Sequence, residues 1–451
     1  MRQLLEDAAQ RAIVYLENLA ERSVVPSPEA IQNLKSLDEP LPEGSMPAEA
    51  VLCQLDEVCS PATMAMAGPR FFGFVTGGAL PATLAANWLA GAWDQNSPLY
   101  NVTPATAHLE KVSLGWLLEL FNLPVACGGS FVTGASVANF TALAAARHAV
   151  LRQAGWNVEA DGLFGAPPIT VVVGEEAHPT LFKSLGLLGL GRSRVTRVPV
   201  DGQGQMRADK LPEIAGPTIV CAQTGNVNTG AFDPLVDICA HAHAAGAWVH
   251  VDGAFGMWAA AVPEMAHLTA GLADADSWAT DFHKWLNVPY DSGLAISRDV
   301  DALRAAMAIT AEYLPTDSPV RNPSDFTPEF SRRGRGVEVW AALRSIGAEG
   351  VRDMIRQACR HAQRFADGLD AAGYEVLNEV VLNQVLVAFG DAGETARTIA
   401  AIQADGTCWA GPTVWQGHVA MRISVSSWAT KEEDVERSLA AMVRIARQIC
   451  R

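Results

Sequence analysis

The sequence lacks several patterns that would assign it to common structural classes. Its eight cysteines include no C-x-x-C pair and no framework spacing, so we predict reduced thiols in a cytoplasmic protein. No apolar run approaches the length of a membrane span, and the first residues contain no apolar core of signal-peptide type. We therefore expect no membrane partner. His241 and His243 diverge around a predicted helix, and we expect no metal site.

Positive charge is also scarce. The chain has 33 Lys and Arg residues against 49 Asp and Glu residues, which gives a formal net charge of −16. The sequence has no basic stripe that could neutralise phosphates, so we expect no nucleic-acid partner. Hydrophobic residues make up 49% of the 451 residues, so the chain is long and apolar enough for two domains, or for one large domain with an appendage.

A dinucleotide fingerprint is missing as well. Gly186, Gly189 and Gly191 lie close together, but they do not form the turn that follows a strand, and no acidic residue follows at a suitable distance. We therefore reject a dinucleotide-binding fold.

Three short apolar runs, each next to polar residues, stand out in what remains. Residues 247–251 end on Asp252, residues 276–281 lead to Lys284, and residues 293–296 follow shortly afterwards. Such runs are typical of a parallel sheet whose carboxyl ends form a site. Asp252 and Lys284 are then expected at neighbouring strand ends, close in space.

A lysine amine facing an aspartate across a small gap suits pyridoxal phosphate (PLP). The amine forms a Schiff base with the cofactor's aldehyde, and the carboxylate keeps the pyridine nitrogen protonated so that the ring accepts electrons. Taken alone, one Asp and one Lys are more often ordinary surface residues.

The residues around this pair carry a resemblance to a known family. HVDGAFG, which contains Asp252, and ADSWATDFHKWLNVPYDSG, which contains Lys284, closely resemble the PLP-dependent group II amino-acid decarboxylases, relatives of aromatic-amino-acid and glutamate decarboxylases. The resemblance implies the fold of aspartate-aminotransferase type (fold type I). This is an α/β fold with a mostly parallel seven-stranded sheet and a small C-terminal α+β domain. It also implies a homodimer with active sites near the interface.

A phosphate site is expected where residues 128–139 open a helix. Small residues lie where the helix amides are unpaired, and both these N–H groups and the helix dipole favour an anion. As a bare glycine-rich turn this signal is weak. The resemblance assigns the cofactor phosphate to Ala135 and Ser136, with Val137 standing where many relatives carry Glu.

The resemblance implies further cofactor contacts. His178 is expected to stack on the cofactor ring and to contact the region of the substrate carboxylate. Asn226 takes the place of a Thr that contacts a ring substituent, Ala254 packs against the ring face, and His283 donates to the phosphate. From the residues alone, a lone His after a strand is more often a loop residue.

Substrate contacts are predicted in three places, each with a structural alternative. The loop 68–78 offers Phe72, Phe74 and Thr76, although ordinary core packing is as good an interpretation for each aromatic residue. Arg422 occupies the place where fold-related aminotransferases hold a substrate carboxylate, and a structural salt bridge is the alternative. Tyr313 lies in a long Pro- and Ser-rich segment that resembles the lid of aromatic decarboxylases, and we expect it to protonate the carbanion after CO2 leaves.

These observations predict four segments and one reaction. Residues 1–50 form an N-terminal helical arm with a dimer contact, residues 51–310 the PLP-binding domain, 311–336 the active-site lid and linker, and 337–451 the small domain. The reaction is decarboxylation of an L-amino acid to amine and CO2, a carboxy-lyase step in carboxylic-acid metabolism. The alternatives are an aminotransferase, a decarboxylation-dependent oxidative deaminase, a carbon–carbon lyase and a non-catalytic cofactor-binding protein. The preferred substrate is an aromatic or medium-sized neutral amino acid.

Overall fold

A computed structural model describes residues 1–309 and 320–450 of the chain. The described residues form two compact units. The larger contains Ala79–Arg360 and Asn378–Gln384, and the smaller contains Met1–Gly78, His361–Leu377 and the chain from Val385 onward. The predicted proton donor Tyr313 lies outside the described residues. In the part of the chain that is described, no helix is long and apolar enough to cross a membrane.

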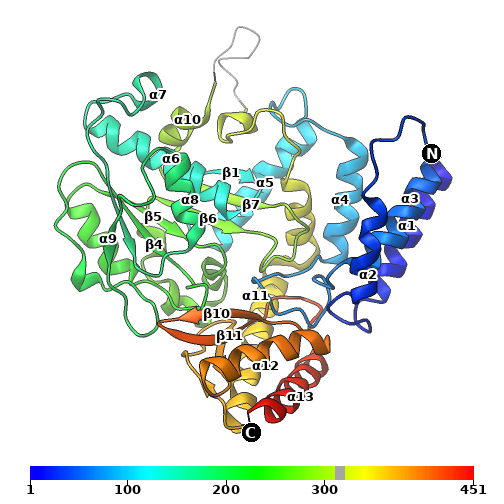
Figure 1. The fold of residues 1–451 in the computed structure, drawn as a ribbon. Helices are drawn as coiled ribbons and strands as arrows, with labels where there is room; N and C mark the ends of the chain where they lie inside the picture. Colours follow the sequence, from blue (N-terminus) through cyan, green and yellow to red (C-terminus); the bar gives the residue numbers. More distant parts are fainter. Residues whose placement is uncertain (310–319, 451) are drawn as a thin grey trace. The chain divides into compact units, whose positions relative to one another are not determined.

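The larger unit is built on a seven-stranded sheet in the order β1-β7-β6-β5-β4-β2-β3. Strands β2 to β6 run parallel to one another, whereas β7 is antiparallel to both β6 and β1. Every residue of β1, β4, β5, β6 and β7 is buried, so both faces of this part of the sheet are covered. The predicted mostly parallel seven-stranded sheet is confirmed (Figure 1). The strands are β1 Gly128–Val132, β2 Thr170–Gly174, β3 Thr196–Val198, β4 Thr218–Gln223, β5 Trp248–Asp252, β6 Ser277–Asp281 and β7 Gly293–Ser297.

Strand β7 corrects one expectation from the sequence. We read its apolar run as a third parallel strand, but its register pairs Gly293 with Asp281 and Ser297 with Ser277, which is antiparallel. Only residues 282–292 connect β6 to β7, and a parallel crossover needs a dozen or more residues, usually with a helix. The short connection therefore turns the chain straight back, and Lys284 lies within that turn.

Helix α6 (Ala135–Gln153) is the central helix of this unit. Twelve of its residues are buried, most of them alanines, and alanine is both the best helix former and small enough for close approach to a sheet. Ala138 and Ala142 pack with Ala279 of β6 and Ala295 of β7. This packing fixes the start of α6 next to the ends of β1 and β6. The unit's other helices are α4 Pro81–Trp93, α5 Pro104–Leu120, α7 Val158–Asp161, α8 Pro179–Leu187, α9 Leu235–Ala244, α10 Val300–Met307, and the 3-10 helices η3 Ala208–Lys210, η4 Gly256–Ala261, η5 Pro263–Thr269, η6 Leu272–Asp274 and η7 Pro323–Asp325.

The smaller unit combines the two ends of the chain. Its sheet has the order β10-β11-β9-β8, with β10 antiparallel to β11 and β8 antiparallel to β9. This is the small α+β sheet domain that we predicted for the C-terminal part. Its elements are α1 Arg2–Glu17, α2 Pro28–Asn33, η1 Leu34–Leu37, α3 Ala48–Cys59, η2 Ser60–Ala62, β8 Glu375–Val376, β9 Gln384–Ala388, α12 Ala392–Asp405, β10 Gly411–Trp415, β11 His418–Ser424 and α13 Glu432–Ile449. The long helix α11, Gly336–Ala371, has a kink at Gly347 and contributes residues to both units.

Candidate active site

The carboxyl ends of β5 and β6 bring together the two residues that the sequence analysis singled out. Strand β5 ends at Asp252, which pairs in register with Ala279 of the parallel strand β6. Strand β6 ends at Asp281, and Lys284 follows three residues later. Because the two strands are parallel neighbours, Asp252 and Lys284 lie at the same edge of the sheet, as predicted.

Asp252 is a buried carboxylate held by neutral donors. Only 5% of the residue's surface is exposed to solvent. Oδ2 accepts a hydrogen bond of 3.1 Å from Asn139 Nδ2, and Oδ1 accepts one of 3.2 Å from the Ala254 backbone N–H. No cation of the described chain pairs with it. Since buried charges are ordinarily paired, this carboxylate is suited to a cationic N–H group supplied by a ligand.

The Lys284 amine pairs with a residue that sequence reasoning missed. Its Nζ lies 3.0 Å from Oδ2 of Asp281, and it also lies 5.9 Å from the centre of the Phe255 ring. Asp281 is 3% exposed. Two signals for it were present in the sequence, because Asp281 ends an apolar strand and precedes the lysine by three residues.

The first amide of α6 binds an anionic oxygen in this structure. The Ala135 N–H, where we predicted a phosphate contact, donates a hydrogen bond of 2.6 Å to Asp281 Oδ1. Access to the amide depends on glycine, because a Cβ on Gly134 would lie 3.2 Å from the same Oδ1. Ser136 follows at the second position of the helix and is partly exposed. The helix start therefore has the donors that an anion requires.

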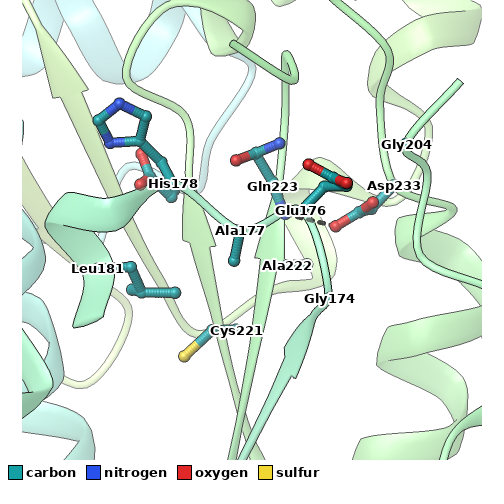
Figure 2. A pocket seen from close by; sticks show the side chains of 11 residues that line it. Gly174, Glu176, Ala177, His178, Leu181, Gly204, Cys221, Ala222, Gln223 and Asp233 are labelled. Carbon is teal, nitrogen blue, oxygen red and sulfur yellow. Dashed lines mark hydrogen bonds between the residues drawn. The ribbon is translucent and has the colours of Figure 1, made fainter. Parts of the chain in front are cut away.

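His178 lines a pocket with Asp252 and Gln223. Figure 2 shows its ring at the start of α8, near the ends of the strands that carry Gly174 and Gln223. His178 Nδ1 accepts from the Thr180 backbone N–H at 3.3 Å and lies 2.7 Å from the Thr180 hydroxyl. These two contacts fix the orientation of the ring at the start of α8.

Asp233 lies in the same pocket, and Figure 2 shows its hydrogen bond to Gln223. Its carboxylate accepts 2.7 Å bonds from the backbone N–H groups of Met206 and Gln223. Burial raises the pKa of Asp233 to about 6, and these two bonds lower it in part. The carboxylate thus holds the loop after β3 against the end of β4.

Several buried polar atoms around this edge have no hydrogen-bond partner among the described residues. They are Thr224 Oγ1, Asn226 Nδ2, His283 Nδ1 and Ser292 Oγ. Asn226 uses Oδ1 to accept from the backbone of Asn228 and Thr229, at 2.8 and 3.3 Å, which leaves its Nδ2 available. Thr224 is a second residue that the sequence analysis missed, although it directly follows a strand end. Unsatisfied buried polar groups are costly, so these four atoms have hydrogen-bonding capacity left for a polar ligand.

His283 and Ala254 are fixed by their neighbours. The His283 ring stacks on Tyr290 with ring centres 4.3 Å apart, and burial lowers the pKa of His283. The carbonyl oxygen of Ala254 accepts a 3.1 Å bond from the Asp281 N–H, which holds the chain after β5 against the end of β6.

Comparison with known proteins decides the family. The model of the pyridoxal-dependent decarboxylase conserved domain matches residues 28–390. The chain belongs to this family. It is a PLP-dependent carboxy-lyase, and the site fits the cofactor: Asp252 lacks a cation, the amide of Ala135 already holds an anionic oxygen, and Lys284 supplies a primary amine.

Relatives in the family act on different amino acids, as their names state. The chain is 28% identical to tryptophan decarboxylase 1 of Oryza sativa subsp. japonica, covering 87% of this chain and 83% of the relative. It is also 28% identical to the L-2,4-diaminobutyrate decarboxylase of Rhizobium meliloti (strain 1021), covering 99% and 93%. A crystal structure of Oryza sativa TDC with PLP and tryptamine has the same fold, with a TM-score of 0.92 at 24% identity over 100% of this chain and 98% of that chain.

The predicted substrate residues lie in the smaller unit. The Phe72 ring is 1% exposed and packs edge-on against Phe365 at 5.0 Å, which agrees with the core-packing alternative. Phe74 is 64% exposed and stacks on Trp409, and Thr76 is buried. Arg422 lies on β11, burial lowers its pKa, and it makes no ion pair with the described residues. The salt-bridge alternative for Arg422 thus finds no partner there, while the substrate roles stay predictions.

Proposed function

We propose that this chain decarboxylates an L-amino acid to the corresponding amine and CO2 at the edge formed by β5, β6 and the start of α6. The observation that carries the proposal is the Asp252 carboxylate. It is buried, and both its oxygens accept hydrogen bonds from neutral donors. It ends β5, and the neighbouring strand β6 leads to Lys284. A family model for pyridoxal-dependent decarboxylases over residues 28–390 supports the reaction class.

When bound, PLP supplies a ring that takes up the electron pair released as the bond from Cα to the carboxylate breaks. In the proposed site, Asp252 holds the proton on the pyridine nitrogen and so keeps the ring electron-poor. The Lys284 amine would hold the cofactor covalently and release it to the amine of the substrate. The amides of Ala135 and Ser136 bind the phosphate, and His283 adds a contact to it.

We propose that His178 orients the substrate and that Asn226 orients the cofactor ring. His178 lines the pocket that also contains Asp252, and its ring is proposed to contact the substrate carboxylate. Asn226 Nδ2, without a partner among the described residues, is proposed to donate to the ring substituent. Ala254, with its small side chain, leaves room for the ring face. Tyr313 is proposed to return a proton to Cα.

The substrate we propose is an aromatic or medium-sized neutral L-amino acid, in line with the relative named tryptophan decarboxylase. L-2,4-diaminobutyrate is the second candidate, because the relative that bears this name matches 99% of the chain. Aminotransfer, oxidative deamination and carbon–carbon cleavage need the same cofactor and the same Lys284. They differ in the product formed, so a product assay separates them.

Assembly and location are also proposals. No residue of α1 is buried, and Leu5 and Leu16, which lie on one face of this helix, are 59% and 39% exposed. We propose that a second copy covers this apolar surface in a homodimer. All eight cysteines lie in the described part of the chain and are free thiols there, which supports a cytoplasmic location. The division into an arm (1–50), a PLP domain (51–310), a lid (311–336) and a small domain (337–451) is retained as a proposal.

A product assay tests the proposed function. Purified protein with PLP is offered each common amino acid, 2,4-diaminobutyrate and ornithine, and CO2, amine, aldehyde and ammonia are all measured. We expect CO2 and one equivalent of amine from one of these substrates. Aldehyde with ammonia, or a keto acid without CO2, would overturn the decarboxylase proposal and leave the cofactor assignment standing.

A further inference from the structure

A chain of five buried polar side chains leads away from Asp252 into the core of the larger unit. Its members come from three elements, α6, β5 and β6, and their exposed fractions range from 0 to 7%. In order they are Asp252, Asn139, His250, Ser277 and Trp248. None of the last four was expected to take part in the site.

The contacts are short and continuous. Asn139 Nδ2 donates to Asp252 Oδ2 at 3.1 Å, and Asn139 Oδ1 lies 2.8 Å from His250 Nε2. His250 Nδ1 lies 2.9 Å from the Ser277 hydroxyl, which in turn accepts from the Trp248 indole N–H at 2.9 Å. Asn139, His250 and Ser277 each have a partner on both sides.

The two ends of the chain determine the direction of every hydrogen bond. The Asp252 carboxylate only accepts, so the Asn139 amide nitrogen donates to it and Asn139 Oδ1 is left to accept from His250 Nε2. The His250 ring is buried and neutral, its pKa being lowered to about 3 by burial, so it carries one proton, and the contact with Asn139 places that proton on Nε2. His250 Nδ1 then accepts from the Ser277 hydroxyl, whose oxygen accepts from the Trp248 indole N–H.

We propose that Asn139 and His250 are positioning residues that hold the Asp252 carboxylate in the orientation and charge state that the PLP ring nitrogen requires. If the Asn139 amide turned over, its oxygen would face the oxygen of Asp252, and two acceptors would oppose each other. The Nε2–H group of His250 prevents this turn, because only Oδ1 of Asn139 can accept from it. The inference rests on the proposed role of Asp252.

A purely structural role makes a different prediction. If the chain only satisfies buried polar groups, its loss lowers the stability of the fold and leaves the state of the bound cofactor unchanged. If the chain positions Asp252, its loss changes the protonation of the cofactor ring in protein that is still folded. The readout must therefore report on the ring nitrogen rather than on activity alone.

The experiment uses full-length protein loaded with PLP that carries ¹⁵N in the ring, and it records the ¹⁵N chemical shift of the ring nitrogen. The variants are Asn139→Leu, His250→Leu and His250→Gln. Glutamine places an amide N–H close to the position of the histidine Nε2, so it keeps the donor to Asn139. Thr141→Val is the matched control, because Thr141 lies on the same helix, is equally buried and bonds only to the Val137 carbonyl.

We expect the ¹⁵N signal of Asn139→Leu and His250→Leu to move toward the unprotonated ring, while His250→Gln and Thr141→Val keep the wild-type signal. With the substrate identified, kcat falls about 10- to 100-fold in the two leucine variants, as for other supporting residues behind a reactive group. KM stays within about twofold, because the phosphate and substrate contacts are untouched. The two His250 variants give the same comparison without changing α6.

The opposite result overturns the proposal. If both leucine variants keep the wild-type ¹⁵N signal and the kcat of Thr141→Val, the chain is a structural network only. Asp252→Asn separates this outcome from a failure of the proposed site. If Asp252→Asn moves the signal and the leucine variants do not, only the positioning role fails, and if Asp252→Asn leaves the signal unchanged, the assignment of Asp252 to the ring nitrogen fails with it.

Discussion

Asp252 and His250 are two residues apart on β5, and both are buried. Asp252 keeps an acceptor role because two neutral N–H groups reach its oxygens, at 3.1 and 3.2 Å. His250 is surrounded by Ser277 and Asn139, which carry no charge, so burial lowers its pKa to about 3. A neutral histidine behind an anionic aspartate is the electrostatic basis of the proposed site.

The buried His250 predicts a dependence of stability on pH. Its pKa is about 3 in the folded protein against an ordinary value of 6.5, so the unfolded chain takes up the proton first as the pH falls. The free energy of unfolding therefore decreases as the pH falls from 6.5 toward 3, by at most about 1.4 kcal/mol per pH unit from this residue. Urea unfolding at pH 7.5 and at pH 5.0 measures the decrease.

His250→Gln is the comparison for this effect, because glutamine does not titrate. All other groups contribute equally to both proteins, so the variant should lose about 2 kcal/mol less than the wild type between the two pH values. Equal losses in the two proteins would show that His250 is not held neutral by the fold.

Asp281 predicts a competition with the cofactor. Its carboxylate accepts from the Ala135 amide at 2.6 Å and pairs with the Lys284 amine at 3.0 Å, and both groups are proposed to bind PLP. Asp281→Asn keeps the shape and removes the charge, so we expect PLP to bind more tightly by about 1 kcal/mol, roughly fivefold in Kd. Equilibrium dialysis of PLP against both proteins checks this, and weaker binding by the variant would mean that Asp281 supports the site.

At the scale of elements, the site depends on the close approach of β7 to the start of α6. A Cβ on Gly293 would lie 2.6 Å from the Cα of Gly134, a backbone atom that can move only if the turn before α6 moves. Gly293→Ala should therefore displace the phosphate-binding amides and weaken PLP binding about tenfold, or about 1.4 kcal/mol. The Kd for PLP is the measurement.

Gly202→Ala is the matched control, because no atom lies within 4 Å of the Cβ it would add. It should bind PLP as the wild type does. If Gly293→Ala also binds PLP normally, the turn before α6 does not form the phosphate site.

The sequence was sufficient for the parts of the fold that local pattern determines. The runs before Asp252 and Lys284 became neighbouring strands, and the small residues after β1 became the start of α6. The direction of β7 was missed, because it depends on the length of a connection rather than on the run itself. Asn139 and His250 were missed as well, since only the packing of α6 on β5 brings their side chains together.

For the whole molecule, the apolar surface of α1 predicts self-association. The double variant Leu5→Glu and Leu16→Glu places two charges on one face of a helix with no buried residue, so the fold of a single chain should tolerate them. We expect the wild type to sediment as a dimer in analytical ultracentrifugation and the double variant to shift toward monomer. Glu17→Lys, exposed on the same helix, should leave the dimer intact, and an unchanged dimer in the double variant would remove α1 from the interface.

The central claim is that the edge formed by β5, β6 and α6 holds PLP through Lys284. The chain has six lysines, Lys35, Lys111, Lys183, Lys210, Lys284 and Lys431, which makes the claim easy to test. Borohydride reduction of the PLP-loaded protein fixes the cofactor to its lysine, and peptide mapping by mass spectrometry then locates it. The account predicts one pyridoxyl group per chain, on Lys284, and none in Lys284→Ala. A pyridoxyl group on another lysine, or none on the wild type, would contradict it.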